Sequence, residues 1–541
     1  MRHNSRGRLG FRWQFFAKQS SRYVILWSAL ILFLVSLILP SLWNDGGQTR
    51  SIRDTSNQVN IRRRRSGLYT IDDTSEFLNC TIPSIANFPD GYLTSEQRQH
   101  GGMLVNLAVV LYMFVALAVV CDEYFMPSLQ LICDDLHLRE DVAGATFMSI
   151  GGSAPELFAS IIGVFVAKGD IGIGTIVGSA VFNLLFVIGL CGLVAGKEIL
   201  LTCWPLIRDS SCYIITIGAL AFAVADTVIH WYDSVMLLLL YLGYLTVMYF
   251  NEDVEHHVTR WVNENVKSDY KKAYQLERHH VSIQNGEGDI LLKDKIEVED
   301  EDTIYCKKTN QLDGKIENHL DPNNNKSEED SSVFDVPSSL LRMIPWLISL
   351  PMFVAFYLTI PDPKKKRWRR CYPITFVIAL LWIGSLTFIL VWMVTVIGYE
   401  LGINDTIMGL TLLAAGASTP DTILSVIAAR EGFGDMAVSH SIGSNIFDIL
   451  IGLGVPWFIK TVIIKFDSKV TIYSGAILYI SVLLLLNVVA LVAAITFLKF
   501  KLNCKLGIVL LFLFFAFITL SLLFEMNYII PGLTLPVCEL V

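Results

Sequence analysis

Ten apolar runs, each long enough to cross a bilayer as a helix, recur along this chain of 541 residues. The sequence is 53% hydrophobic with a mean hydropathy of +0.52, which is typical of polytopic membrane proteins and not of soluble ones. We therefore predict an all-α polytopic membrane protein. Its core helices are expected at about 103–126, 140–167, 171–196, 209–228, 232–250, 373–398, 405–430, 436–462, 471–497 and 506–526.

The first 102 residues precede these runs and carry export signals. Residues 1–43 combine a basic flank with the apolar run Tyr23–Trp43, which is typical of a signal peptide or an uncleaved signal anchor. Residues 44–102 are then extracellular or luminal. Asn79 begins the glycosylation sequon Asn-Cys-Thr, which fits that location.

A long polar stretch divides the apolar runs into two clusters, 103–250 and 373–526. Residues 251–340 hold 21 Asp and Glu against 11 Lys and Arg and are predicted to be an acidic cytosolic loop. Residues 341–372 form an apolar segment with two prolines followed by a strongly basic linker. A span there would place six positive charges outside, so an interfacial or re-entrant segment is expected.

This topology leaves residues 527–541 as an extracellular or luminal tail. Only Cys80 and Cys538 then clearly face the oxidising side, which suggests a disulfide between them.

The two clusters contain a repeat. Residues 151–190 align without a gap with residues 416–455, which lie 265 positions further along the chain. Twelve of the 40 aligned positions are identical, and they include Gly, Ser, Pro and Asp. The alignment places Glu156 opposite Asp421 and Asn183 opposite Asp448. The first copy (140–196) begins in the cytosol and the second (405–462) outside, so the core is predicted to be two inverted five-helix repeats, the arrangement that secondary transporters use.

Each copy also interrupts an apolar run with small residues and a proline, "GGSAPE" and "GASTPD". Such breaks free backbone carbonyls and half-helix ends that can coordinate a cation. Carboxylates inside a membrane are expensive and indicate function, so Glu156 and Asp421 are predicted to share one site.

The repeats offer the oxygen ligands that hard cations such as Ca²⁺ require, and no Cys–His cluster that would favour zinc or copper. The predicted ligands are three carboxylates, four hydroxyls and two amides: Glu156, Asp421, Asp448, Ser153, Ser418, Ser179, Ser444, Asn183 and Asn445. Three carboxylates in a low dielectric call for a cation load near +3, such as Ca²⁺ with one monovalent ion or several Na⁺. Competition between such loads is what an antiporter needs.

Other polar residues of the repeats have simpler interpretations. Asp170 and Asp435 follow glycines at helix boundaries, which favours N-capping. Serines in such helices often bond to their own helix. His440 stands opposite Thr175, and a pH-sensing role for it is the less favoured reading.

These motifs, with "CDEYFMPSL", "GSAVFN", "MGLTLLAAGASTPD" and "GDMAVSHSIGSNIFD", resemble the potassium-dependent sodium/calcium exchangers over about residues 103–526. The resemblance implies ten core helices in two inverted halves and exchange of Na⁺ for Ca²⁺ and K⁺ by alternating access. It also implies that Glu156 and Asp421 are the central Ca²⁺ and Na⁺ carboxylates and that Asp448 confers potassium dependence. Ala417 departs from the family by removing a hydroxyl, and Thr419 replaces an aliphatic residue.

Three alternatives stay open at this point. A potassium-independent Na⁺/Ca²⁺ exchanger is the nearest, followed by a Ca²⁺/H⁺ exchanger of the same fold. An intramembrane aspartyl protease would use Asp233 and Asp435, because "GFGD" matches its signature. We expect no enzyme activity, no cofactor and no nucleic acid partner, only the transported ions and the bilayer, in the plasma membrane or a secretory-pathway membrane of trans-Golgi, endosomal or melanosome-like type.

Overall fold

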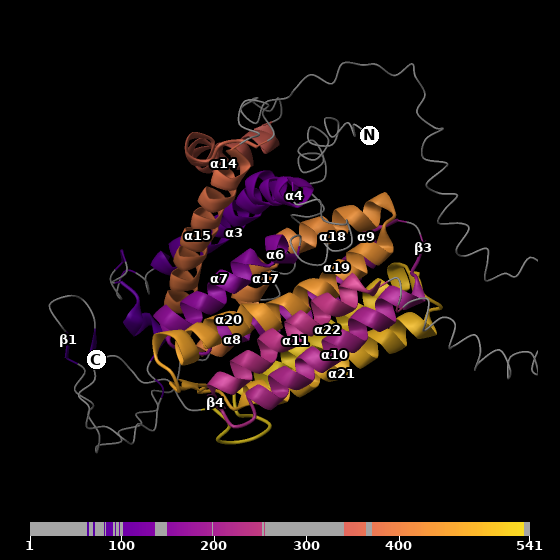
Figure 1. Cartoon of the computed structure of the whole chain (residues 1–541). Coiled ribbons are helices and arrows are strands. Elements are labelled where there is room, and N and C mark those ends of the chain that lie inside the picture. Colours follow the sequence, from indigo (N-terminus) through magenta and orange to yellow (C-terminus); the bar gives the residue numbers. More distant parts are fainter. Residues whose placement is uncertain are drawn as a thin grey trace, which may run out of the picture. The chain divides into compact units, whose positions relative to one another are not determined.

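Within the residues that the structure describes, helices lie in each of the predicted ranges, and residues 140–148 of the second range are outside that description (Figure 1). The computed structural model describes residues 101–135, 149–196, 198–251, 340–363 and 371–534, with Val254 and short pieces between residues 62 and 97. Its contacts divide the chain into two units, and this helical bundle belongs to the unit formed by Ser28–Asn251 and Ser349–Val541. Asn79, Cys80 and Cys538 lie outside the described residues, as do residues 1–61 and almost all of the acidic stretch.

The first cluster contains five helical lines, by which we mean runs of consecutive helical elements that follow one another with at most a short break. Several of these lines include turns of π-helix. Their parts are α3 (Met103–Val120), η5 (Cys121–Phe125) and α4 (Met126–Asp135); α6 (Ser149–Gly152), α7 (Ala154–Ile162) and η7 (Gly163–Ala167); α8 (Ile171–Val181), η8 (Phe182–Val187) and α9 (Ile188–Val194); α10 (Cys203–Ala223); and α11 (Trp231–Tyr249).

The second cluster repeats this pattern after α14 (Leu340–Thr359). Its parts are α15 (Tyr372–Glu400); α16 (Asp405–Met408), η11 (Gly409–Leu413), α17 (Ala414–Ala417) and α18 (Thr419–Glu431); α19 (Gly434–Phe447), η12 (Asp448–Leu453), α20 (Gly454–Phe458) and η13 (Ile459–Ile464); α21 (Ala476–Phe497); and α22 (Cys504–Glu525). In the described part of the chain eight helices are long and apolar enough to span a membrane, or nine if the bent pair α16–α18 counts as one span.

The connections between helices gather at two opposite ends of the bundle. At one end β3 (Ile199–Leu200) pairs with β6 (Lys501–Leu502), and at the other β4 (Val228–Ile229) pairs with β5 (Val470–Thr471). Figure 1 shows β3 and β4 at these two ends. Successive connections therefore alternate between the ends, as consecutive membrane crossings require.

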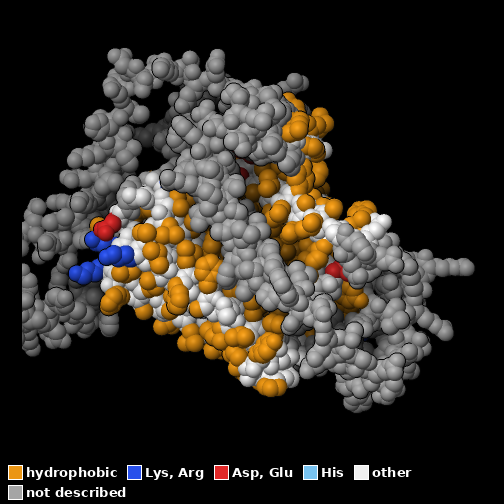
Figure 2. All heavy atoms as spheres, turned by 180° about the vertical axis from the view of Figure 1, so that it is seen from behind, with side chains coloured by type: hydrophobic (Ala, Val, Ile, Leu, Met, Phe, Trp, Pro, Cys, Tyr) orange, Lys and Arg blue, Asp and Glu red, His pale blue; other side chains and the backbone are white. Residues whose placement is uncertain are grey.

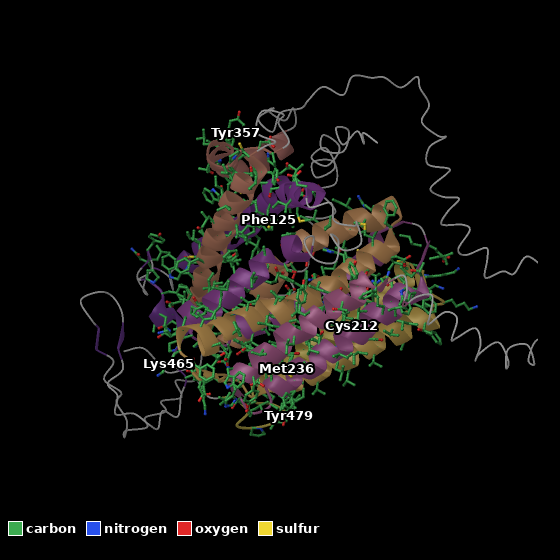
Figure 3. All side chains as sticks on the ribbon, in the orientation of Figure 1. Phe125, Cys212, Met236, Tyr357, Lys465 and Tyr479 are labelled. Atoms are coloured by element: carbon green, nitrogen blue, oxygen red, sulfur yellow. The ribbon has the colours of Figure 1, made fainter. Side chains whose placement is uncertain are left out.

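Neighbouring helices follow the same alternation. In Figure 3, Cys212 marks the middle of α10, and Met236 lies in the first third of α11, toward the β4 end at which α10 ends and α11 begins. In Figure 2, the described flank is covered with hydrophobic side chains, and the visible Lys and Arg side chains gather at one end of the molecule. An apolar flank with the basic side chains gathered at one end fits a protein that lies in a bilayer.

Several helix boundaries differ from the prediction. The first helical stretch continues through α4 to Asp135 instead of ending at 126, and α10 ends at Ala223 instead of 228. α10 begins at Cys203 instead of 209, and α21 begins at Ala476 instead of 471. Arg208 and Asp209 are accommodated inside α10 because they pair with each other at 2.7 Å and because Arg208 also donates to Asn251. Residues 470–474 instead form β5 and the turn after it.

The apolar segment before the basic linker is a continuous helix. α14 runs through both Pro345 and Pro351, which the prediction treated as obstacles to a straight helix. Its second half packs on the start of α15, where the Trp382 indole nitrogen donates to the Thr359 hydroxyl at 2.9 Å and Phe356 meets the ring of Trp382 edge to face.

Glycines allow the backbones of the two clusters to touch. A Cβ on Gly178 of α8 would lie 2.4 Å from the carbonyl oxygen of Leu410, and one on Gly409 would lie 2.5 Å from that of Ile171. Small residues permit such close helix contacts inside membranes, where packing replaces the hydrophobic effect. The contact holds α8 against η11, and these helical lines continue into the polar segments described below.

We expect Gly178→Ala to destabilise the protein by about 1–3 kcal/mol, because overpacking there displaces backbone and not a flexible side chain. The midpoint of thermal unfolding in detergent measures the effect. Gly218→Ala is the matched control, since a Cβ at Gly218 of α10 meets nothing within 4 Å. Equal midpoints for the two variants would contradict the assigned contact.

Candidate cation-binding site

Two helix breaks of the same geometry meet inside the bundle. Ser153 separates α6 from α7 with φ −92° and ψ 9°, and Ser418 separates α17 from α18 with φ −77° and ψ 10°. A proline follows each break within the first turn of the next helix, where its missing N–H costs nothing. The second break bends the helix by 48°.

The two breaks bring side chains of one repeat onto carboxylates of the other. The Ser418 hydroxyl donates to Glu156 Oε1 at 3.1 Å. The Asn183 amide donates to Asp421 Oδ2 at 3.1 Å. Each predicted central carboxylate is thus held by a residue more than 200 positions away in the chain, so the site requires both clusters.

The site is fully enclosed by protein. All nine predicted ligands are at most 1% exposed: Ser153, Glu156, Ser179, Asn183, Ser418, Asp421, Ser444, Asn445 and Asp448. Among the described residues no Lys or Arg pairs with these carboxylates, and the one basic neighbour is His440, whose Nε2 lies 3.4 Å from Asp421 Oδ1. Buried carboxylates of like charge repel one another and gain from bound cations.

Asn183 and Asp448 occupy equivalent positions but have different partners. Both stand in π-helical turns, η8 and η12. Such turns are rare in proteins overall, and those that occur are often found at functional sites. The Asn183 amide is used by Asp421, whereas neither oxygen of Asp448 has a hydrogen bond in the described part of the chain. Asp448 lies within electrostatic range of Glu156, Asp421 and the Ser153 hydroxyl.

Seven side-chain oxygens of the site have no hydrogen-bond partner among the residues that the structure describes. They are Ser153 Oγ, Glu156 Oε2, Asn183 Oδ1, Asp421 Oδ1, Asn445 Oδ1 and both carboxylate oxygens of Asp448. Ca²⁺ takes six to eight such oxygens, in flexible geometry. No three His, Cys, Asp or Glu side chains of the described residues converge on one point, so hydroxyl, amide and carbonyl oxygens would complete any ion's shell.

The other predicted ligands bond within or across the helices. The Ser179 hydroxyl donates to the carbonyl of Ile176 and the Ser444 hydroxyl to that of Ser441, each on its own helix. The Asn445 amide donates at 2.9 Å to the carbonyl of Ala180, which is its own equivalent 265 positions earlier. This bond therefore joins equivalent positions of the two sequence copies.

Sequence reasoning missed two neighbours of this site. Tyr213 of α10 is fully buried, and its hydroxyl lies beside Asn445 and within electrostatic range of Asp448. Gly152 leaves room for Asp421, because a Cβ there would lie 2.0 Å from Asp421 Oδ1. A tyrosine in an apolar helix gives no signal of its own, whereas Gly152 belongs to the repeated motif.

The N-capping hypotheses for Asp170 and Asp435 are wrong. Asp170 stands at the N-cap of α8 but caps no helical N–H; its Oδ2 accepts the backbone N–H groups of Tyr473 and Ser474 at 2.9 and 2.7 Å. Asp435 lies inside the first turn of α19, and its Oδ1 accepts the N–H of Thr202 at 2.7 Å. Loops from other helices provide the donors that the local sequence did not reveal.

The aspartyl protease alternative fails on geometry. Asp233 forms a capping box with His230 at the start of α11, at the end where β4 lies. Asp435 lies at the opposite end, bonded to the chain just after β3. The two carboxylates that such an enzyme must bring together are separated by the length of the bundle.

The family model described as sodium/calcium exchanger protein matches residues 106–250 and 371–523. Human sodium/potassium/calcium exchanger 5 is 40% identical, over 84% of this chain and 90% of its own. Human sodium/potassium/calcium exchanger 4 is 37% identical, over 88% of this chain and 90% of its own. Rat sodium/potassium/calcium exchanger 2 is 35% identical, over 84% of this chain and 83% of its own. Among solved structures, the sodium-calcium exchanger NCX_Mj is 20% identical, with 77% of this chain and 99% of that chain covered and a TM-score of 0.39.

The apolar helices, the buried acidic site and these relatives define a multi-pass integral membrane transporter, and not an enzyme. More narrowly, the chain belongs to the sodium/calcium exchanger family.

Proposed function

We propose that the protein exchanges Na⁺ for Ca²⁺ together with K⁺. Support comes from the carboxylates that two broken helices hold inside the bundle, with seven oxygens lacking hydrogen bonds. The sodium/potassium/calcium exchangers that are 35–40% identical to this chain carry those three ions in their names. The transported ions are cargo, and no cofactor is part of the proposal.

Glu156 and Asp421 bind Ca²⁺ or Na⁺ at the centre of the site. Ser153, Ser418, Ser179, Ser444, Asn183 and Asn445 contribute oxygens, as do carbonyls freed at the breaks. Asp448, with both oxygens unpaired, binds K⁺. Ala417 is fully buried at the second break, and Thr419 donates back to the carbonyl of Ala415 at 3.4 Å, so neither side chain replaces the hydroxyl that the family pattern has there.

The charge of the site explains why cargo must always be bound. Three ionised carboxylates gain most from a load near +3, which Ca²⁺ with K⁺ or a set of Na⁺ ions supplies. An empty site is costly in a low dielectric, so the change of access from one side to the other is favoured only with cargo. The single observation that carries this proposal is that both central carboxylates accept hydrogen bonds from the opposite repeat.

The ten helical lines are then two inverted five-helix repeats with alternating access at their centre. The β4 end faces the exterior or lumen, and the β3 end, where Lys501 pairs with Glu198, faces the cytosol. The proposal retains the signal peptide or anchor in residues 1–43, the glycosylated Asn79, the Cys80–Cys538 disulfide and the interfacial position of α14. Both the plasma membrane and a secretory-pathway membrane agree with it.

Sodium-driven ⁴⁵Ca²⁺ flux into vesicles tests the function directly. In wild-type protein we expect uptake that requires a Na⁺ gradient and that rises when K⁺ accompanies Ca²⁺. Uptake that needs Na⁺ but ignores K⁺ would favour the potassium-independent exchanger. Uptake driven by a proton gradient without Na⁺ would favour the Ca²⁺/H⁺ exchanger, although the paired "GN…EH" motifs expected of that group are not in this sequence.

A further inference from the structure

A second acidic cavity lies at the β4 end of the bundle, among loops that the central site does not use. Its volume is about 50 Å³. Its walls come from the turn before α8, the start of α16, the turn before α21, the end of α22 and the segment near η3 (Ser84–Asn87). Space of this size admits roughly four water molecules.

Three carboxylates line this cavity: those of Asp170, Asp405 and Glu525. Ser474 links two of them, since its N–H donates to Asp170 Oδ2 at 2.7 Å and its hydroxyl donates to Glu525 Oε2 at 2.7 Å. The Ser84 N–H donates to Asp405 Oδ2 at 3.2 Å. Each carboxylate is thus fixed by the protein and retains oxygen lone pairs.

Asp170 gives the cavity an unsatisfied group. The residue is 6% exposed, and although Oδ2 accepts two backbone N–H groups, Oδ1 is buried without any hydrogen-bond partner among the described residues. A buried carboxylate oxygen left in this way costs free energy unless a proton or a cation meets it.

The charged residues that line the described wall of the cavity are all acidic. Glu525 faces Asp170 from α22 and Asp405 from α16, and the other titratable residues of the described wall are Tyr399 and Tyr473. No Lys or Arg belongs to that wall. Burial is the main reason that the pKa of Asp170 is raised to about 7, and repulsion from Glu525 and Asp405 adds to it, whereas the two backbone N–H groups oppose it.

We propose that this cavity is a second cation site, in which Asp170, Asp405 and Glu525 hold a partly hydrated divalent cation. The cation is hard, because every donor is oxygen. It keeps water, because the carboxylates do not converge on one point and the cavity has room for several molecules. The site is separate from the central one and does not depend on the proposed exchange.

Occupation of this site would join helical lines that carry the central ligands. Asp170 directly precedes α8, which leads to Asn183, and Asp405 begins α16, which leads through η11 and α17 to Ser418. A cation between them ties these two lines to α21 and α22 at one end of the bundle. With the β4 end outside, as proposed above, abundant external divalent cations would hold the loops and helix ends around this cavity in one arrangement.

Terbium luminescence tests the site in the full-length protein in lipid nanodiscs. Tb³⁺ substitutes for Ca²⁺ on oxygen ligands, and Tyr399 and Tyr473 line the cavity as sensitisers. The background is Glu156→Gln with Asp448→Asn, which weakens the central site. We expect a saturable Tb³⁺ signal to remain in this background protein. Adding either Asp170→Asn or Glu525→Gln to it should raise the half-saturating Tb³⁺ concentration by about tenfold or more.

Asp467→Asn is the matched control, because Asp467 is an exposed carboxylate in the loop between η13 and β5, at the same end of the bundle. It should leave the signal unchanged. Displacement of Tb³⁺ by Ca²⁺ at lower concentrations than by Na⁺ supports a divalent site, and the reverse order overturns that assignment. The absence of a saturable signal in the background, or a signal that both variants leave intact, overturns the site itself.

Failure of the exchange proposal would appear separately, as ⁴⁵Ca²⁺ flux that survives Glu156→Gln while the cavity signal stays the same.

Discussion

Replacement of Glu156 by Gln should abolish exchange, with Na⁺-driven ⁴⁵Ca²⁺ flux reduced by about a hundredfold or more. Gln keeps the size of the side chain and can still accept the hydrogen bond from Ser418, but it removes one negative charge from a buried site whose one basic neighbour among the described residues is His440. Loss of one member of a buried charge interaction costs about 3–5 kcal/mol, which is about two to three and a half powers of ten in binding. Asp421→Asn should act in the same way.

Glu198→Gln is the control for this result, because Glu198 is an exposed carboxylate whose pair with Lys501 lies at the β3 end. Exposed pairs contribute little, so both flux and expression should remain near wild type. The amount of protein in the membrane must be measured for every variant. Flux that survives Glu156→Gln at normal expression would show that the cation site is misplaced.

Asp448→Asn should remove the dependence on K⁺ while Na⁺-driven Ca²⁺ flux continues. The substitution makes the second repeat match the first, where Asn183 occupies the equivalent position. It also removes a carboxylate whose two oxygens both lack hydrogen bonds in the described part of the chain. Flux measured over a range of K⁺ concentrations should rise with K⁺ in the wild type and be flat in the variant.

Asp435→Asn serves as the matched control for the potassium experiment. It lies on the same helical line, in the first turn of α19, and an amide oxygen can still accept the N–H of Thr202. Potassium dependence should be unchanged in this variant. A wild-type rise with K⁺ that persists in Asp448→Asn would assign the potassium ligand to another residue.

Much of the fold follows from hydropathy and periodic breaks, because both are properties of local sequence. The apolar runs located the ten helical lines, and the repeat located the breaks at Ser153 and Ser418. The boundaries of α10 and α21 escaped prediction, because they depend on partners elsewhere, such as Asn251 for Arg208. The continuous helix through Pro345 and Pro351 was also not evident from local rules.

The candidate site shows the same division. Residue type and spacing paired Glu156 with Asp421 and set Asn183 against Asp448, but could not show which side chains bond across the repeats. Asp170 is the clearest example: its neighbours in sequence suggested a helix cap, and its true donors lie about 300 positions away. Sequence alone also gave no reason to place Asp405 and Glu525 beside it.

The bonds that cross between the repeats have a consequence for how the protein is made. Ser418 follows Glu156 by 262 residues, so a ribosome adding about 5–20 residues per second needs roughly 13–50 seconds to supply the partner. During that interval the newly inserted first half holds a carboxylate in the membrane without the hydroxyl that later meets it. Retention of that half by the insertion machinery until the second half emerges would solve the problem, and premature release would expose the nascent chain to quality control.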